Sequence, residues 1–127
     1  MNRLAPRWSV VVADLEPSVG HEQAGIGRAV VVSYEPFQRS GLVTICPITA
    51  ARTSPRYPGD VAIPAGEGGQ TRDGVIICSQ VRTLSINRIE DGPIGSVTDP
   101  SIRLAVRRGL AHHLGLDIPP VADGAAA

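Results

Sequence analysis

The sequence contains no lysine. All twelve basic residues among its 127 are arginine, and twelve acidic residues balance them, so the formal net charge is zero. The molecule as a whole therefore does not attract nucleic acid, and any such affinity must come from a local group of arginines. Genomic composition bias is the simpler explanation for the arginines, and a preference for forked phosphate contacts is the alternative.

Aromatic residues are also scarce, at 3% against a hydrophobic fraction of 43%, so an aliphatic core is expected. The two cysteines, Cys46 and Cys78, lie in apolar runs without metal-ligand spacing, which favours buried free thiols over disulfides or a metal site. No apolar run approaches the ~20 residues of a membrane span. We predict a soluble, cytoplasmic single domain over residues 1–118 and a disordered Ala- and Gly-rich tail over residues 119–127.

Short β-branched segments separated by Gly and Pro predict a series of strands. The expected strands cover residues 8–15, 28–34, 42–48, 61–63, 74–79 and 81–84, with a further short strand or turn within 89–97. One helix is predicted to begin after Asp99, with Pro100 in its first turn and Gly115 as its terminator. Its apolar positions recur every four residues, at Ile102, Val106, Leu110 and Leu114. These elements predict an α+β fold, mostly β, with a small antiparallel barrel.

A loop of about twelve residues, 16–27, joins the first two predicted strands. Loops of this length inside a compact domain are uncommon and often functional. Its centre carries His21, Glu22 and Gln23, flanked by glycines. Titratable and hydrogen-bonding side chains on a loop that a rigid strand supports are the usual layout of a binding or catalytic site.

The segment over residues 17–33, PSVGHEQAGIGRAVVVS, resembles the signature of the MazF/PemK family. Members of this family are toxins of type II toxin–antitoxin pairs and act as sequence-specific endoribonucleases. Three further matches follow in the family's order: CPIT at 46–49, a Tyr-Pro…Val segment at 57–61, and DGV…SQVRT at 73–83. Together the matches span roughly residues 9 to 115.

The resemblance implies a fold of the PemK/CcdB toxin type with a C-terminal helix, a homodimer and a cognate antitoxin protein. It implies metal-independent cleavage of single-stranded mRNA through a 2′,3′-cyclic phosphate, which inhibits translation and growth, with no cofactor. Thr49 matches the family's catalytic threonine. Gln80 and Arg82 lie where the family contacts RNA.

Three loop residues could carry the proton transfers or the binding. Histidine as a residue type exchanges protons near neutral pH, so His21 suits a general acid or base, although a surface histidine that bonds the loop backbone is equally compatible. Glu22 could orient His21, act as the base or hold an arginine, or it could only shape the loop. Gln23 could bond base edges, but loop scaffolding is favoured.

Arg28 is the candidate for stabilising charge on the phosphate, because a guanidinium stays protonated. The family pattern has Arg-Pro before the apolar strand, whereas this chain has Gly27-Arg28, so its arginine comes one residue later. Along a strand, a shift of one residue turns a side chain to the opposite face.

The loop after Thr49 contains Arg52, Arg56 and Tyr57. A basic loop with one aromatic ring suits a single strand, through phosphate contacts and base stacking, although a solvated surface loop is the commoner explanation. His112 and His113, near the end of the predicted helix, are assigned no chemistry.

The predicted catalytic residues are therefore Arg28, Thr49, His21 and Glu22, and the predicted RNA-binding residues are Gln23, Arg52, Arg56, Tyr57, Gln80 and Arg82. No metal site is expected. A non-catalytic role is the alternative: a gyrase-binding toxin of the same fold, or a relative that has lost its activity and binds only antitoxin or RNA. Trp8 is the only tryptophan, and the C-terminus lacks the tryptophan associated with gyrase binding.

Overall fold

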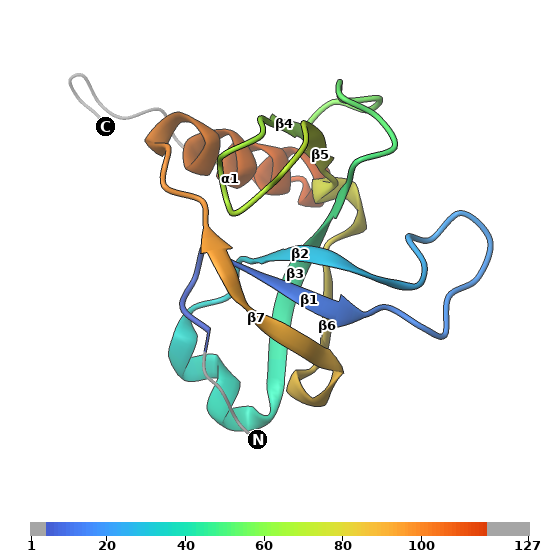
Figure 1. Ribbon diagram of the computed structural model, residues 1–127, viewed down its shortest axis with the longest axis vertical. Coiled ribbons are helices and arrows are strands. Elements are labelled where there is room, and N and C mark those ends of the chain that lie inside the picture. The colour runs from blue at the N-terminus through green and yellow to red at the C-terminus, as the bar shows by residue number, and fades with distance from the viewer. Residues whose placement is uncertain (1–4, 117–127) are drawn as a thin grey trace.

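A seven-stranded antiparallel sheet and one C-terminal helix make up most of the computed structural model, which describes residues 5–116 (Figure 1). The strands are β1 (Ser9–Asp14), β2 (Ile26–Val31), β3 (Leu42–Thr49), β4 (Val61–Ile63), β5 (Gly74–Ile76), β6 (Arg82–Ser85) and β7 (Ile89–Ser96). The helices are α1 (Pro100–Leu114) and three short 3₁₀ helices, η1 (Glu35–Ser40), η2 (Cys78–Gln80) and η3 (Ile86–Arg88). The predicted fold class is confirmed, while the predicted tail at 119–127 lies outside the described residues.

Strand β3 is the centre of the sheet. The strand order is β4-β5-β3-β2-β1-β7, and β6 also pairs with β3. Ile45 of β3 pairs with Val31 on one side and with Arg82 on the other. Strands β5 and β6 therefore lie along the same edge of β3, opposite β2.

Successive side chains of β1, β2 and β3 enter two different cores. Val10, Val30 and Cys46 belong to a core that α1 covers through Ile102 and Val106. Their neighbours in sequence enter a second core, which contains Val11, Ala29, Val31, Ile45 and Leu84. We call the first side of these strands the helix face and the second the far face. Each face is apolar because both are buried.

The cysteines lie in the helix-face core as buried free thiols, as predicted. A hydrogen bond with Cys78, together with burial, raises the pKa of the Cys46 thiol well above its ordinary value. No helix among the described residues has the length and apolar character that crossing a membrane requires.

The strand predicted for residues 74–79 ends earlier, at Ile76, and the turn η2 follows it. Ile76 pairs with Ile48 of β3, and Arg82 pairs with Ile45 of β3. The step between the two β3 residues is three positions, whereas the step from Ile76 to Arg82 is six. The three extra residues are accommodated in the η2 turn. The turn interrupts one edge of the sheet and brings Ser79 and Gln80 out of the strand path.

The prediction for the second strand was also shifted, because β2 begins at Ile26, where it pairs with Asp14, and ends at Val31. Helix α1 begins and ends as predicted: Asp99 accepts a hydrogen bond from the Ser101 amide at 2.8 Å, and Gly115 ends the helix with φ of 69°. Leu114, expected on the apolar face, is 56% exposed because the contacts of α1 with the core end before it.

Two carboxylates brace the start of α1 and make the stability depend on pH. A hydrogen bond from the Thr98 amide lowers the pKa of Glu67, and one from Ser101 lowers that of Asp99. A carboxylate whose pKa is lowered by folding stabilises the fold above its unfolded-state pKa, and this contribution is lost as the pH falls through the folded-state pKa.

We therefore predict that the free energy of unfolding falls as the pH is lowered from about 5 to about 3. In Glu67→Gln the fall is shallower, because the amide keeps an acceptor for Thr98 but does not titrate. Urea denaturation of the wild type and of Glu67→Gln at a series of pH values measures the free energy of unfolding. The same pH dependence of this free energy in both proteins would contradict the prediction.

Candidate active site

The loop between β1 and β2 projects from the sheet and is closed at its base (Figure 1). The Leu15 amide donates to the Gly25 carbonyl at 2.9 Å, and the Gly25 amide donates to the Glu16 carboxylate at 2.6 Å. Gly25 has φ of 78°, which a residue with a side chain rarely adopts. Glu16 also accepts hydrogen bonds from Ser18, so it organises the loop, a role the sequence pattern did not indicate.

Within the loop, Glu22 takes part in a short turn. Its carboxylate accepts from the Val19 amide at 2.7 Å, and its own amide donates to the Val19 carbonyl at 3.2 Å. One carboxylate oxygen is therefore used to shape the loop, and the second has no hydrogen bond among the described residues. His21, beside it, is exposed.

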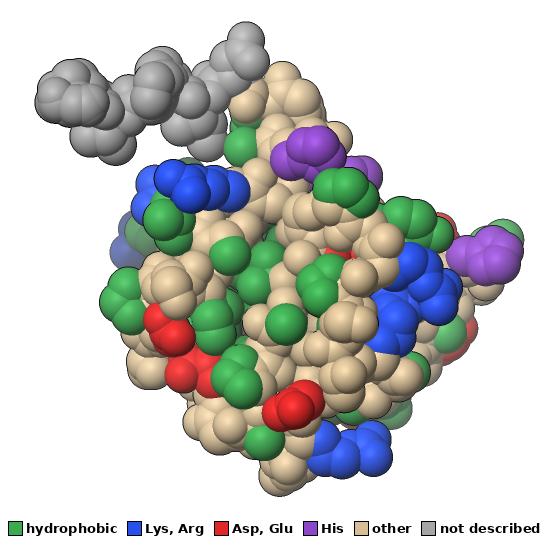
Figure 2. Space-filling view, turned by 90° about the horizontal axis from the view of Figure 1, so that it is seen from above, with side chains coloured by type: hydrophobic (Ala, Val, Ile, Leu, Met, Phe, Trp, Pro, Cys, Tyr) green, Lys and Arg blue, Asp and Glu red, His purple; other side chains and the backbone are tan. Residues whose placement is uncertain are grey.

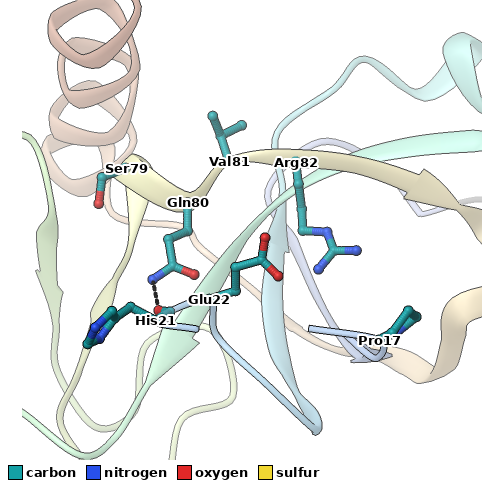
Figure 3. Close-up of a pocket in the computed structure, with 7 residues that line it drawn as sticks. All are labelled: Pro17, His21, Glu22, Ser79, Gln80, Val81 and Arg82. Carbon is teal, nitrogen blue, oxygen red and sulfur yellow. Dashed lines mark hydrogen bonds between the residues drawn. The ribbon is translucent and has the colours of Figure 1, made fainter. Parts of the chain in front are cut away.

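Gln80 clamps this loop against η2. Its Oε1 accepts from the Gln23 amide at 2.6 Å, and its Nε2 donates to the His21 carbonyl at 3.4 Å (Figure 3). The side chain predicted to bind RNA thus holds the loop backbone on both sides of Glu22. Gln23 contributes its backbone to this clamp.

A hollow of about 610 Å³ lies between the loop and the η2–β6 segment, lined by Pro17, His21, Glu22, Ser79, Gln80, Val81 and Arg82. We call it the loop hollow. Figure 3 shows the Glu22 carboxylate turned towards the Arg82 guanidinium. Arg82 donates to the Leu15 carbonyl at 3.2 Å, and no carboxylate among the described residues pairs with it. An imidazole, a carboxylate and a guanidinium therefore share one open hollow.

Arg28 lies elsewhere. Its guanidinium donates to the Gly69 carbonyl and to Gln70 Oε1, both at 3.1 Å. It lines a second hollow of about 300 Å³, together with Ile48, Ala50, Gln70, Thr71 and Arg72. The shared lining with Ile48 places Arg28 on the helix face, so the structure does not bring it together with His21, Glu22 and Arg82.

Side-chain alternation explains this separation. Val31 and Arg82 both pair with Ile45, so all three side chains lie on the far face. Ala29 lies on that face too, and Gly27, two residues earlier in β2, is on the same side. Position 27 and Arg82 therefore share the far face, while Arg28 points away from it.

Thr49 ends β3 and is 7% exposed. Its Oγ1 accepts from the Ala51 amide at 3.1 Å, as a residue that caps a turn does. It does not line the loop hollow. By alternation from Ile45 it belongs to the far face, the side that carries Arg82.

The loop after Thr49 is largely exposed at Arg56 and Tyr57. Arg52 has a buried Nε without a hydrogen-bond partner in the described part of the chain. Tyr57 lines a third hollow of about 400 Å³ with Pro58, Ser79, His112 and His113. Figure 2 shows histidine and arginine side chains on one face of the molecule. Sequence reasoning gave the two helix histidines and Ser79 no role, since only the tertiary structure brings them together in this hollow.

Metal-ligating side chains are not gathered at this site. Within residues 5–116, no three His, Cys, Asp or Glu residues lie close enough together to hold a metal ion.

The mostly antiparallel sheet, the C-terminal helix and the clamped β1–β2 loop place the chain in the PemK/CcdB fold class. Residues 6–114 match the family of PemK-like, MazF-like toxins of type II toxin–antitoxin systems. The chain belongs to this family, which confirms the resemblance seen in the sequence.

Named relatives agree with this assignment. The endoribonuclease toxin ChpB of Escherichia coli K12 is 33% identical over 104 residues, which cover 80% of this chain and 88% of that protein. Endoribonuclease EndoA of Bacillus subtilis is 35% identical over 89 residues, 69% of this chain and 77% of that protein.

Solved structures show the same fold. MazF from Deinococcus radiodurans aligns with a TM-score of 0.76 at 26% identity, covering 90% of this chain and 99% of that one. An endoribonuclease from a mycobacterial species, in complex with its cognate antitoxin, aligns with a TM-score of 0.71 at 25% identity, covering 91% and 99%.

The Gln80 clamp predicts local opening of the loop on substitution. In Gln80→Ala the Gln23 amide loses its acceptor, so its hydrogen exchange is expected to accelerate about tenfold, the equivalent of one lost hydrogen bond. Gln80→Glu keeps that acceptor and is the matched control, with Gln23 still protected. Residue-resolved amide exchange measures both, and an unchanged Gln23 rate in Gln80→Ala would contradict the clamp.

Proposed function

We propose that this chain is the toxin of a type II toxin–antitoxin pair and a sequence-specific, metal-independent endoribonuclease that cleaves single-stranded mRNA and so inhibits translation and growth. The observation that carries the proposal is the loop hollow, which His21 and Glu22 of the family's signature loop line together with Arg82. Relatives named as endoribonucleases support it.

The cleavage needs three events: the 2′-hydroxyl loses its proton, the phosphate gains negative charge, and the leaving 5′-oxygen receives a proton. Attack of the 2′-oxygen on phosphorus forms a 2′,3′-cyclic phosphate as the bond to the 5′-oxygen breaks. We assign the two proton transfers to Glu22 and His21. Glu22 keeps a carboxylate oxygen available, and the His21 imidazole is exposed and can exchange a proton.

For the growing charge on the phosphate, the geometry favours Arg82 over Arg28. Arg82 lies on the far face, as position 27 does, and its guanidinium faces the hollow without a carboxylate partner among the described residues. A charge-assisted contact to a phosphate oxygen is the natural use of such a group. The position of Arg28 on the helix face argues against the catalytic role expected for it.

Thr49 and the loop after it do not line the loop hollow, and we propose that they contact the RNA beside it. The Thr49 hydroxyl accepts from the Ala51 amide, so its own proton is left to donate to a phosphate oxygen. Arg52 and Arg56 would contact backbone phosphates further along the strand. Gln23 and Gln80 serve RNA binding indirectly, by holding the loop in place.

The partners proposed are a second copy of the chain and an antitoxin. A symmetric dimer would bring two such loops to one groove and add the second chain's arginines to it. A cognate antitoxin with a flexible acidic segment would cover the groove and block RNA. With mRNA as its substrate, the protein would act in the cytoplasm.

An activity-lost relative is the second candidate, and Gly27 is the observation that favours it, because the family's arginine is absent from that position. Such a protein would bind antitoxin or RNA without cutting. Gyrase binding has no feature in residues 5–116 that supports it.

Cleavage of a long single-stranded RNA in EDTA, with mapping of the cut ends, tests the proposal. We expect discrete cuts that leave 2′,3′-cyclic phosphate and 5′-hydroxyl ends. Arg82→Ala should lower the rate on the order of 10²–10³-fold, the usual cost of removing a group that stabilises transition-state charge. Arg28→Ala should stay within a few-fold of the wild type, like the remote control Arg39→Ala, which removes an exposed side chain of η1.

The opposite ranking of Arg28→Ala and Arg82→Ala would reject the assignment of Arg82 and return the role to Arg28. No cutting by a folded wild-type protein would reject the nuclease and favour the activity-lost relative. Cuts that require added metal would contradict the metal-independent mechanism.

A further inference from the structure

The third hollow adjoins the proposed cleavage site. Ser79 lines both this hollow and the loop hollow, so the two are neighbours across one residue of η2. The remaining lining comes from Tyr57 and Pro58 of the loop before β4 and from His112 and His113 at the end of α1. We call it the aromatic hollow. No role in the proposed chemistry uses its two histidines.

Ser79, which separates the two hollows, is held in place by hydrogen bonds to a buried carboxylate. Asp60, only 7% exposed, accepts from the Ser79 amide at 3.0 Å and from the Ser79 hydroxyl at 3.3 Å. Both oxygens of the buried Asp60 carboxylate thus accept hydrogen bonds from Ser79. The position of η2 relative to the loop before β4 is therefore set by charge-assisted hydrogen bonds.

The helix and the loop that face each other across the aromatic hollow are also in close contact. Gly59 and Gly109 pack backbone to backbone, and a Cβ on Gly109 would lie 2.0 Å from the Gly59 carbonyl oxygen. This contact needs glycine on the helix and fixes Tyr57 and Pro58 beside the last turn of α1. The hollow is a built feature of the fold, since both of its sides are anchored.

The chemistry of the lining suits a nucleobase better than a phosphate. Arginine is absent from the lining, and the carbonyl end of α1 disfavours an anion. Tyr57 is 57% exposed, and its ring offers a stacking surface. Imidazole and hydroxyl groups both donate and accept hydrogen bonds, which matches the edge of a base.

We propose that the aromatic hollow binds the base of a nucleotide flanking the cleaved bond, stacked on Tyr57 and contacted at its edge by His112 and His113. This inference rests on the proposed function. The loop hollow takes the scissile phosphate, and the strand continues past Ser79 into the aromatic hollow. The hollow then contributes to which single strands bind well, while the proton transfers stay with the loop residues.

Equilibrium binding of uncleavable oligonucleotides tests this subsite. The core probe is a short RNA with a 2′-deoxy sugar at the cut site, its sequence taken from the mapped cuts or, without cuts, from a mixed-sequence pool. The extended probes add one nucleotide on the 5′ or the 3′ side. For the wild type we expect one extension to tighten binding by roughly 5- to 150-fold, the range of base–aromatic stacking.

Tyr57→Ala should remove the gain from extension, whereas Tyr57→Phe keeps the ring and should keep the gain. The double variant His112→Ala, His113→Ala should reduce the gain on the same side. Tyr57 is exposed, so its variants are expected to fold, and thermal unfolding checks this.

An extension gain that survives Tyr57→Ala would overturn the subsite, as would equal weakening of both probes or a failure of the wild type to prefer either extension. Absence of cleavage by the wild type would reject the proposed nuclease instead. The binding comparison does not depend on cleavage, so the two failures are distinguishable.

Discussion

Side-chain alternation along β2 and β3 is the constraint on which the site depends. Ala29, Val30 and Val31 of β2 and Ile45 and Cys46 of β3 are buried on both faces, so a shift of one residue would exchange the two cores. Ala29 and Val30 enter different cores, and the register carries the same division to Ile45 and, across it, to Arg82. A guanidinium one residue from the family's position therefore belongs to another surface, with Gln70 and Gly69 as its partners.

The site is assembled from segments that are far apart in the sequence. Gln80 holds a loop almost sixty residues away, because the three extra residues of η2 carry it out of the sheet edge. Asp60 then fixes the neighbouring Ser79 from behind. The loop hollow and the aromatic hollow meet at this turn, so one element positions the proposed chemistry and the proposed flanking-base contact.

Local patterns were sufficient for much of the fold. Asp99 and Gly115 delimit α1 as their cap chemistry predicted, and β4 has the expected bounds. The predicted end of β5 was wrong. The apolar run continues past Ile76 in the sequence, and only the register against β3 shows where the strand is interrupted. The roles expected at the site remain predictions. The Gln80 clamp and the hollow of Tyr57 and the helix histidines depend on tertiary contacts, which no local pattern contains.

The central claim is that an arginine stabilises the charge on the scissile phosphate only when its side chain lies on the far face. Transfer of an arginine to position 27 in a chain without Arg82 tests it most directly, because a Cβ at Gly27 meets no atom within 4 Å. We predict that Gly27→Arg raises cleavage by Arg82→Ala by about tenfold or more. Cleavage that stays at the level of Arg82→Ala, or that depends on Arg28 in both backgrounds, would contradict the account.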